Sequence, residues 1–138
     1  MKRIVIDTNC LVAILPALSP YHQVWKDFLE GELEFCVTTE ILLEYEEIIS
    51  AKTSPYFAAV IIKALINSKN LIRVNPAWRF QLIKVDLDDN KFIDCAVCGQ
   101  ADYIVSEDKH FRSISNVQFP PINIIRLKDF CKKLKAGT

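Results

Sequence analysis

The stretch Ile4-Val5-Ile6-Asp7 decides the fold, because it is a short run of β-branched apolar residues that ends in a carboxylate. Near the other end of the chain, Tyr103-Ile104-Val105 is followed by Ser106-Glu107-Asp108 in the same arrangement. Neither run alternates polar with apolar residues, which is typical of strands buried on both faces of a parallel sheet. The two runs therefore predict parallel strands that each deliver a carboxylate at the carboxyl end.

Three further runs have the composition of strands, and helical patterns lie between them. We expect the additional strands at residues 35–38, 71–74 and 123–126. We expect helices at 21–29, 39–49, 55–66, 88–97 and 127–134, and a loop or short helix at 76–85. Strands that alternate with helices predict an α/β sandwich with helices on both faces of the sheet.

The length and composition fit one globular domain over residues 1–138. Of the 138 residues, 51% are hydrophobic and 25% are charged, so the chain can bury a substantial core. The formal net charge is zero, which argues against a protein that holds nucleic acid by its overall charge. An enzyme that meets phosphates through bound metal ions is compatible with this charge.

The cysteines and the N-terminus predict a reduced, cytoplasmic protein without a membrane segment. Five cysteines form an odd, dispersed set, and several lie in apolar runs as small buried side chains would. Cys95 and Cys98 have C-x-x-C spacing but lack a second ligand pair, which disfavours a zinc or redox site. The first apolar run is too short for a signal peptide, and no stretch approaches the roughly 20 apolar residues of a membrane span.

Several acidic side chains are expected at one edge of the sheet. Ligand sites in open parallel sheets form beyond the carboxyl ends of the strands. Asp7 and Asp108 each follow an expected strand, and the strand at 35–38 leads into the helix that carries Glu44. An aspartate after a strand is often only a helix cap or turn residue. The coincidence of three strand ends is the stronger indication of a site.

Asp89 is expected to face inward from its helix. At about 100° per residue, Asp89 lies in the middle of an apolar arc that includes Phe92 and Ala96. Lys91 falls outside that arc, and Asp94 takes a position suited to solvent or capping. Asp89 could itself cap the first turn. A buried carboxylate otherwise needs hydrogen-bond donors or a cation, and a metal ion would supply one.

The helix at 39–49 offers two candidate glutamates. Glu44 and Glu46 flank opposite edges of its apolar arc, and the helical period alone leaves both open. Carboxylates that converge without His or Cys select Mg²⁺ or Mn²⁺ rather than zinc. Such ions beside a phosphodiester can activate water and stabilise the leaving oxygen, so this set of acids predicts phosphodiester hydrolysis.

Four segments together resemble one family. Residues 4–9 resemble the strand and D-T-N opening of PIN domains, and residues 38–45 resemble their second acidic motif. Residues 86–92 are similar to the D-P-D-D-N-K-F segment of a bacterial branch, and residues 101–109 to its A-D-Y-I-V-T-G-D-K ending. That branch is akin to VapC toxins of toxin–antitoxin systems. The resemblance extends from residue 1 to about residue 127.

The resemblance implies a fold, an activity and a set of site residues. It implies a three-layer α/β/α sandwich with a mostly parallel central sheet, and Mg²⁺- or Mn²⁺-dependent cleavage of single-stranded RNA. It also implies an antitoxin partner and a homodimer. By position it assigns metal-binding, catalytic roles to four acids and orienting roles to two further residues. The acids are Asp7, Glu44, Asp89 and Asp108, the orienting residues are Asn9 and Ser106, and Asp94 is a further candidate.

The sequence departs from the family pattern at a few positions. Leu87 replaces the usual proline, Ser106 the usual threonine and Glu107 the usual glycine. Glu107 adds a negative charge beside Asp108, which would tighten metal binding or repel RNA. Substrate affinity is the property that this change affects.

Two other classes of function were weighed against a nuclease. A non-catalytic PIN-like module that binds RNA or another protein would keep the fold without the chemistry, and the complete acidic set argues against it. A phosphatase of the haloacid dehalogenase type needs a second aspartate where this chain has Asn9. A phospho-receiver needs adjacent acids before the phosphorylated aspartate, and none precede Asp7.

Overall fold

A sheet of parallel strands forms the centre of the protein, for which we analysed a computed structural model that describes residues 1–76, 90–108 and 123–137. Within these residues, five strands pair in the order β3-β2-β1-β4-β5, and every pairing is parallel. The strands are β1 (Lys2–Ile6), β2 (Leu33–Val37), β3 (Leu71–Arg73), β4 (Tyr103–Val105) and β5 (Ile124–Ile125).

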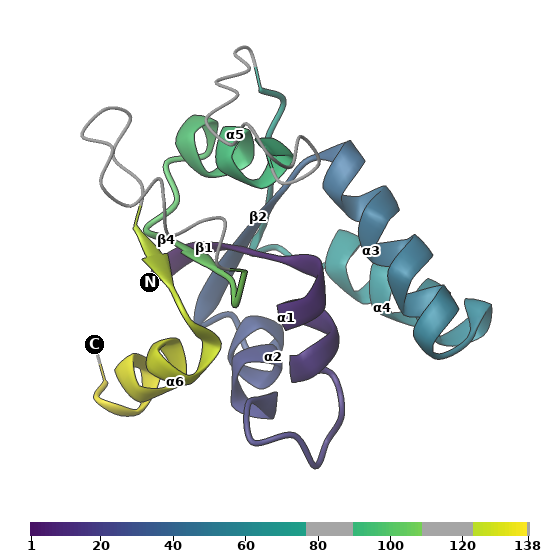
Figure 1. Cartoon of the computed structure of the whole chain (residues 1–138), viewed down its shortest axis with the longest axis horizontal. Helices are drawn as coiled ribbons and strands as arrows, with labels where there is room; N and C mark the ends of the chain where they lie inside the picture. Colours follow the sequence, from purple (N-terminus) through teal and green to yellow (C-terminus); the bar gives the residue numbers. More distant parts are fainter. Residues whose placement is uncertain (77–89, 109–122, 138) are drawn as a thin grey trace.

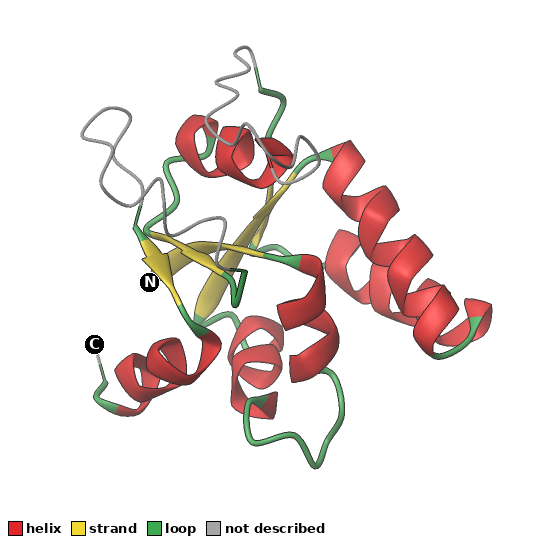
Figure 2. Ribbon diagram, viewed as in Figure 1, coloured by secondary structure: helices red, strands yellow, loops and turns green. Residues whose placement is uncertain are grey.

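Helices cover both faces of this sheet (Figures 1 and 2). They are α1 (Thr8–Ile14), α2 (His22–Leu29), α3 (Thr39–Lys52), α4 (Pro55–Ile66), α5 (Asn90–Cys98) and α6 (Leu127–Lys135). Helix α5 lies across β1, β2 and β4 on one face, and α1 and α2 lie on the opposite face. Helices α3 and α4 pack against each other as a hairpin beside the sheet. The expected α/β/α sandwich is confirmed.

The central strands are buried on both faces, as their continuous apolar runs predict. Ile4, Val5 and Ile6 of β1 are completely buried. In the register of the sheet, Ile6 lies opposite Val105 of β4. One backbone hydrogen bond continues this pairing past the end of β1, from Asp7 N–H to the carbonyl of Val105 at 3.0 Å. The residue that follows β1 is thereby fixed beside the end of β4.

All five expected strands are present, and the five expected helices are confirmed within the described residues, with ends that differ by a few residues. The helix α1 was not expected. Its seven residues include four buried side chains, and its sequence has no polar face that would produce a helical period. The helix is instead specified by its cap, because Asp7 accepts hydrogen bonds from the backbone N–H groups of Asn9 and Cys10. Of the segment 76–85, only Pro76 is among the described residues.

The cysteine side chains behave as apolar residues. All five are free thiols, and Cys10, Cys36 and Cys95 are buried in the core. Burial raises the pKa of the Cys36 thiol to about 11 and that of the Cys10 thiol to about 12. These thiols are therefore protonated at neutral pH, and a protonated thiol is a poor nucleophile. None of the described helices has the length and apolar character needed to span a bilayer.

Candidate active site

Asp7 stands at the junction of β1 and α1 and is the best-defined residue of the site. Its side chain is 9% exposed. Oδ1 accepts hydrogen bonds from the backbone N–H of Asn9 at 2.8 Å and of Cys10 at 3.3 Å. Oδ2 accepts a hydrogen bond from the Ser106 hydroxyl at 2.6 Å. Both carboxylate oxygens are thus fixed in orientation, and each keeps a lone pair for a further partner.

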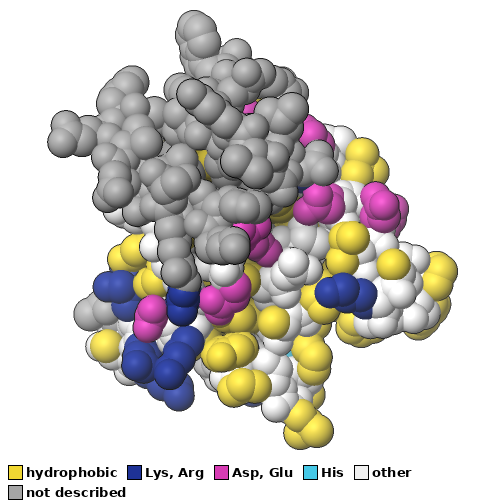
Figure 3. Space-filling model, viewed as in Figure 1, with side chains coloured by type: hydrophobic (Ala, Val, Ile, Leu, Met, Phe, Trp, Pro, Cys, Tyr) yellow, Lys and Arg dark blue, Asp and Glu magenta, His cyan; other side chains and the backbone are white. Residues whose placement is uncertain are grey.

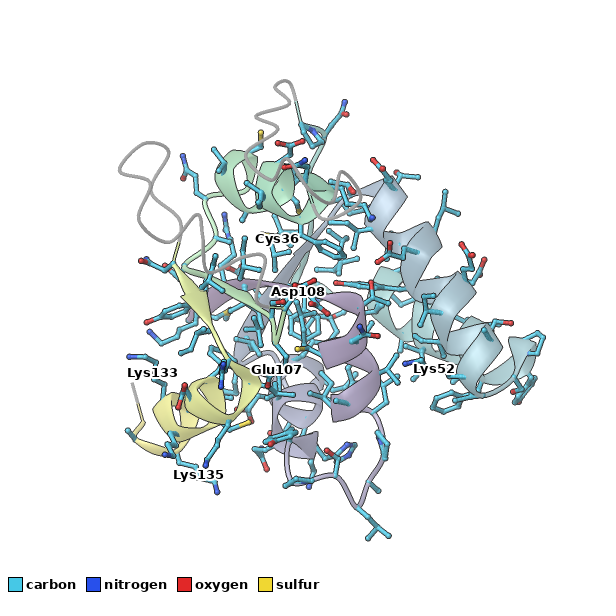
Figure 4. The ribbon with its side chains drawn as sticks, in the orientation of Figure 1. Cys36, Lys52, Glu107, Asp108, Lys133 and Lys135 are labelled. Carbon is cyan, nitrogen blue, oxygen red and sulfur yellow. The ribbon has the colours of Figure 1, made fainter. Side chains whose placement is uncertain are left out.

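Ser106 joins Asp7 to Asp108. While the Ser106 hydroxyl donates to Asp7, its oxygen accepts the backbone N–H of Asp108 at 3.0 Å. This second bond folds the turn that follows β4 and brings Asp108 close enough for its charge to act on Asp7. Figure 4 shows Asp108 in the middle of the molecule, near the start of α1. Glu107, by contrast, is exposed.

The charge of Asp7 is unfavourable in the absence of a cation. Burial raises the pKa of Asp7 above its ordinary value. The hydrogen bonds from Ser106, Cys10 and Asn9 oppose this shift, and the negative charge of Asp108 adds to it. A cation bound between Asp7 and Asp108 would offset both the burial and the repulsion.

Glu44 reaches the same region from α3. Its Oε2 accepts a hydrogen bond from the hydroxyl of Thr8, the residue directly after Asp7. Its Oε1 forms an ion pair with Nζ of Lys91 in α5, at 2.7 Å. Glu46, the other candidate left open by the helical period, is exposed to solvent. Glu44 is therefore the glutamate of α3 that faces α1.

Two expectations for α5 were wrong. Lys91 was placed off the inward face and Asp94 at a solvent or capping position, yet they are only 7% and 2% exposed. Every residue from Asn90 to Ala96 is buried, because α5 lies against both the sheet and α3. A helix covered on more than one side has no single inward arc, so the helical period could not place its polar residues. Asp89 lies outside the described residues.

A polar cavity of about 260 Å³ adjoins this cluster at the carboxyl ends of β2 and β3. Buried Lys91 and Asp94 form part of its wall, together with residues of three other segments. The remaining lining residues are Thr38, Thr39, Glu40, Val74, Asn75 and Pro76. In Figure 3, acidic side chains gather on this side of the molecule, whereas basic side chains gather over α6.

The structure thus brings most of the expected site residues to one edge of the sheet. Asp7 and Asp108 are linked through Ser106, and Glu44 is linked to the residue next to Asp7. Asn9 contributes its backbone N–H to Asp7, while its side chain is exposed. Sequence reasoning missed the parts played by Thr8 and Lys91. Only Thr8 had a signal, since it directly follows the first aspartate.

The donor chemistry fits a hard divalent cation. Asp7, Asp108 and Glu44 offer carboxylate oxygens, the ligands that Mg²⁺ and Mn²⁺ prefer. Among the described residues, no three Asp, Glu, His or Cys side chains are grouped closely enough to hold an ion. The fit therefore rests on the Asp7–Asp108 pair and on the raised pKa of Asp7.

A parallel α/β/α sandwich with acids at the carboxyl ends of β1 and β4 defines a class of protein that binds ligands at this edge of the sheet. The family model of the PIN domain matches residues 3–110, and the chain therefore belongs to the PIN domain family.

Solved structures agree with this fold. One is VapBC2 from Rickettsia felis bound to a DNA fragment from its promoter, with a TM-score of 0.63 and 13% identity over 90% of this chain and 98% of the other. Another is DNA-bound VapBC from Salmonella typhimurium, with a TM-score of 0.59 and 14% identity over 92% and 99%. No curated protein matches the sequence.

Proposed function

We propose that this protein is a metal-dependent endoribonuclease that hydrolyses phosphodiester bonds of single-stranded RNA. The observation that carries the proposal is the arrangement of Asp7, Ser106 and Asp108, in which a buried carboxylate with a raised pKa lies beside a second acid. Membership of the PIN domain family supports the same chemistry.

Four acids would hold Mg²⁺ or Mn²⁺ in this enzyme. Asp7, Glu44, Asp89 and Asp108 are the proposed metal-binding and catalytic residues. A bound divalent ion supplies charge that lowers the pKa of water and stabilises the leaving oxygen of a phosphodiester. Ser106 and the backbone of Asn9 hold the oxygens of Asp7 in place, so that the carboxylate is oriented before a ligand arrives.

RNA would meet this site through the metal rather than through a basic surface. The chain has 17 Lys and Arg residues against 17 Asp and Glu, so its overall charge attracts no polyanion. In Figure 3 the acidic side chains lie on the same side as the proposed site. A bound divalent ion would reverse the local repulsion of phosphate, and RNA binding should therefore depend strongly on the metal.

We also propose that the enzyme is the toxin of a toxin–antitoxin pair and acts in the cytoplasm, where its five thiols stay reduced. The structural neighbours are VapBC complexes, which supports an antitoxin partner for this chain. A homodimer is part of the same proposal. Co-expression with the product of the adjacent reading frame should give a stable complex without nuclease activity.

The experiment for the nuclease uses the purified protein with Mn²⁺ and a labelled single-stranded RNA. The wild type should cleave, and Asp7→Asn should be slower by roughly 10²–10³, the loss expected for a group that stabilises developing charge. Glu46→Gln is the matched control, because Glu46 is an exposed acid of α3 and should leave the rate unchanged. Equal rates for the wild type and Asp7→Asn would refute the proposal.

The second candidate is a non-catalytic PIN-like module that binds RNA or another protein. The observation in its favour is the Glu44–Lys91 ion pair, in which an ammonium group already occupies one of the acids. This candidate predicts that replacing Asp7, Glu44, Asp89 and Asp108 together by alanine leaves RNA binding in metal-free buffer unchanged. It also predicts that the wild type cleaves no RNA with any divalent ion.

A further inference from the structure

Lys91 is a buried cation inside the proposed active site. Its side chain is 7% exposed, and its Nζ lies 2.7 Å from Oε1 of Glu44. A buried ammonium group is stable only beside an anion, because it has lost its hydration. Glu44 is such an anion, and at 28% exposure it is the more solvated partner of the pair.

Both oxygens of Glu44 are held by this chain. Oε1 faces the Lys91 ammonium, and Oε2 accepts the hydrogen bond of the Thr8 hydroxyl. The two partners come from α5 and α1, so the carboxylate is fixed between two helices that cover opposite faces of the sheet. Asp7 and Asp108, by comparison, are linked to each other by a neutral hydroxyl. The cluster therefore has one acid with a built-in cation and two acids without one between them.

Charge limits the number of metal ions that such a cluster can bind. Sites with two divalent ions hold them roughly 3.5–4 Å apart and need carboxylates to separate their charges. A divalent ion on Glu44 would lie close to the Lys91 ammonium and be repelled by it. A divalent ion on Asp7 and Asp108 would meet no such cation among the contacts described for those two residues.

We propose that Lys91 takes the place of a second divalent cation at Glu44, so that the active site binds one divalent ion, on the side of Asp7 and Asp108. This inference rests on the proposed function and refines it, because Glu44 then acts as the anion paired with Lys91 rather than as a metal ligand. Lys91 is a positioning residue in this arrangement.

The test is the number of Mn²⁺ ions bound, measured by the electron paramagnetic resonance signal of free Mn²⁺ during a titration. The wild type should bind one ion per chain. Lys91→Met keeps the length of the side chain but removes the charge, and it should bind two. Lys91→Met combined with Glu44→Gln removes the vacated carboxylate and should return to one. Lys91→Arg keeps a cation and should also bind one.

The outcomes separate this inference from the proposed function. If the wild type binds one ion and Lys91→Met also binds one, the inference is wrong and the metal-dependent nuclease stands. Two ions in the wild type would also refute the inference alone. If the wild type binds none, or if Asp108→Asn binds as much as the wild type, both fail.

Thermal unfolding gives a second measurement if Lys91→Met folds poorly. Saturating Mn²⁺ should raise the melting temperature of Lys91→Met more than that of the wild type, because one more ion binds only the folded state. An equal or smaller increase for Lys91→Met would overturn the inference.

Discussion

The Ser106 hydroxyl donates a hydrogen bond of 2.6 Å to Oδ2 of Asp7, although the two residues lie 99 positions apart in the chain. They meet because β1 and β4 are neighbours in the sheet and end at the same edge. The same hydroxyl oxygen accepts the N–H of Asp108, so one small side chain orients both acids. The geometry of the proposed metal site therefore depends on a residue that has no charge.

Replacing Ser106 should impair the site without removing an acid. In Ser106→Ala, Asp7 loses one of its hydrogen bonds and the turn that carries Asp108 loses its anchor. We expect both Mn²⁺ affinity and kcat/KM to fall by about 10–100-fold, the usual effect of removing a group that orients a metal ligand. Ser106→Thr keeps the hydroxyl and should retain most activity. A fully active Ser106→Ala would show that the hydrogen bond has no such role.

The raised pKa of Asp7 predicts how the stability of the metal-free protein depends on pH. The folded state binds the Asp7 proton more tightly than the unfolded state does, chiefly because of burial. Stability from this group is therefore fully present below the unfolded pKa of about 4 and is lost as the pH rises through the folded pKa. In EDTA, Asp7→Asn should unfold at higher urea than the wild type at pH 7, and this difference should shrink toward pH 4.

Metal should reverse this order. Saturating Mn²⁺ stabilises only a folded state in which Asp7 is ionised, so the wild type should gain stability and Asp7→Asn should gain little. The pair of urea curves, with and without Mn²⁺, separates a metal-binding carboxylate from a helix cap. A simple cap would make Asp7→Asn less stable or unchanged in EDTA and would give no difference in the response to metal.

The contacts of the site explain which parts the sequence could predict. The strands that carry Asp7 and Asp108 were predictable, because continuous β-branched runs are a local signal of burial on both faces. The choice between Glu44 and Glu46 was not, since it depends on how α3 is rotated against α1. Lys91 was misplaced because its burial depends on α3, a helix more than 30 positions away in sequence.

Gly99 should tolerate no side chain. A Cβ at this position would lie 2.9 Å from the carbonyl oxygen of Cys95 and 2.9 Å from Cγ2 of Val74. We expect Gly99→Ala to lower the free energy of unfolding by about 1–3 kcal/mol, as overpacking in a core does. Gly31→Ala is the comparison, because Gly31 has a φ of +80° but open space around it, so only backbone strain of about 1 kcal/mol applies. Urea unfolding of both variants measures the difference, and equal losses would contradict the close packing.

The Glu44–Lys91 pair predicts that stability and activity can be separated. Glu44→Gln leaves the buried Lys91 ammonium without its anion, which costs about 3–5 kcal/mol for a fully buried pair. Because Glu44 is 28% exposed, we expect a loss nearer 2 kcal/mol, together with a rate lower by roughly 10²–10³. Adding Lys91→Met should restore much of the stability by removing the uncompensated charge, yet the rate should stay low. Glu46→Gln should change the free energy of unfolding by less than about 0.5 kcal/mol, because its side chain is exposed. Urea unfolding and RNA cleavage on these four proteins form the measurement, and recovery of activity in the double variant would show that Glu44 matters only for folding.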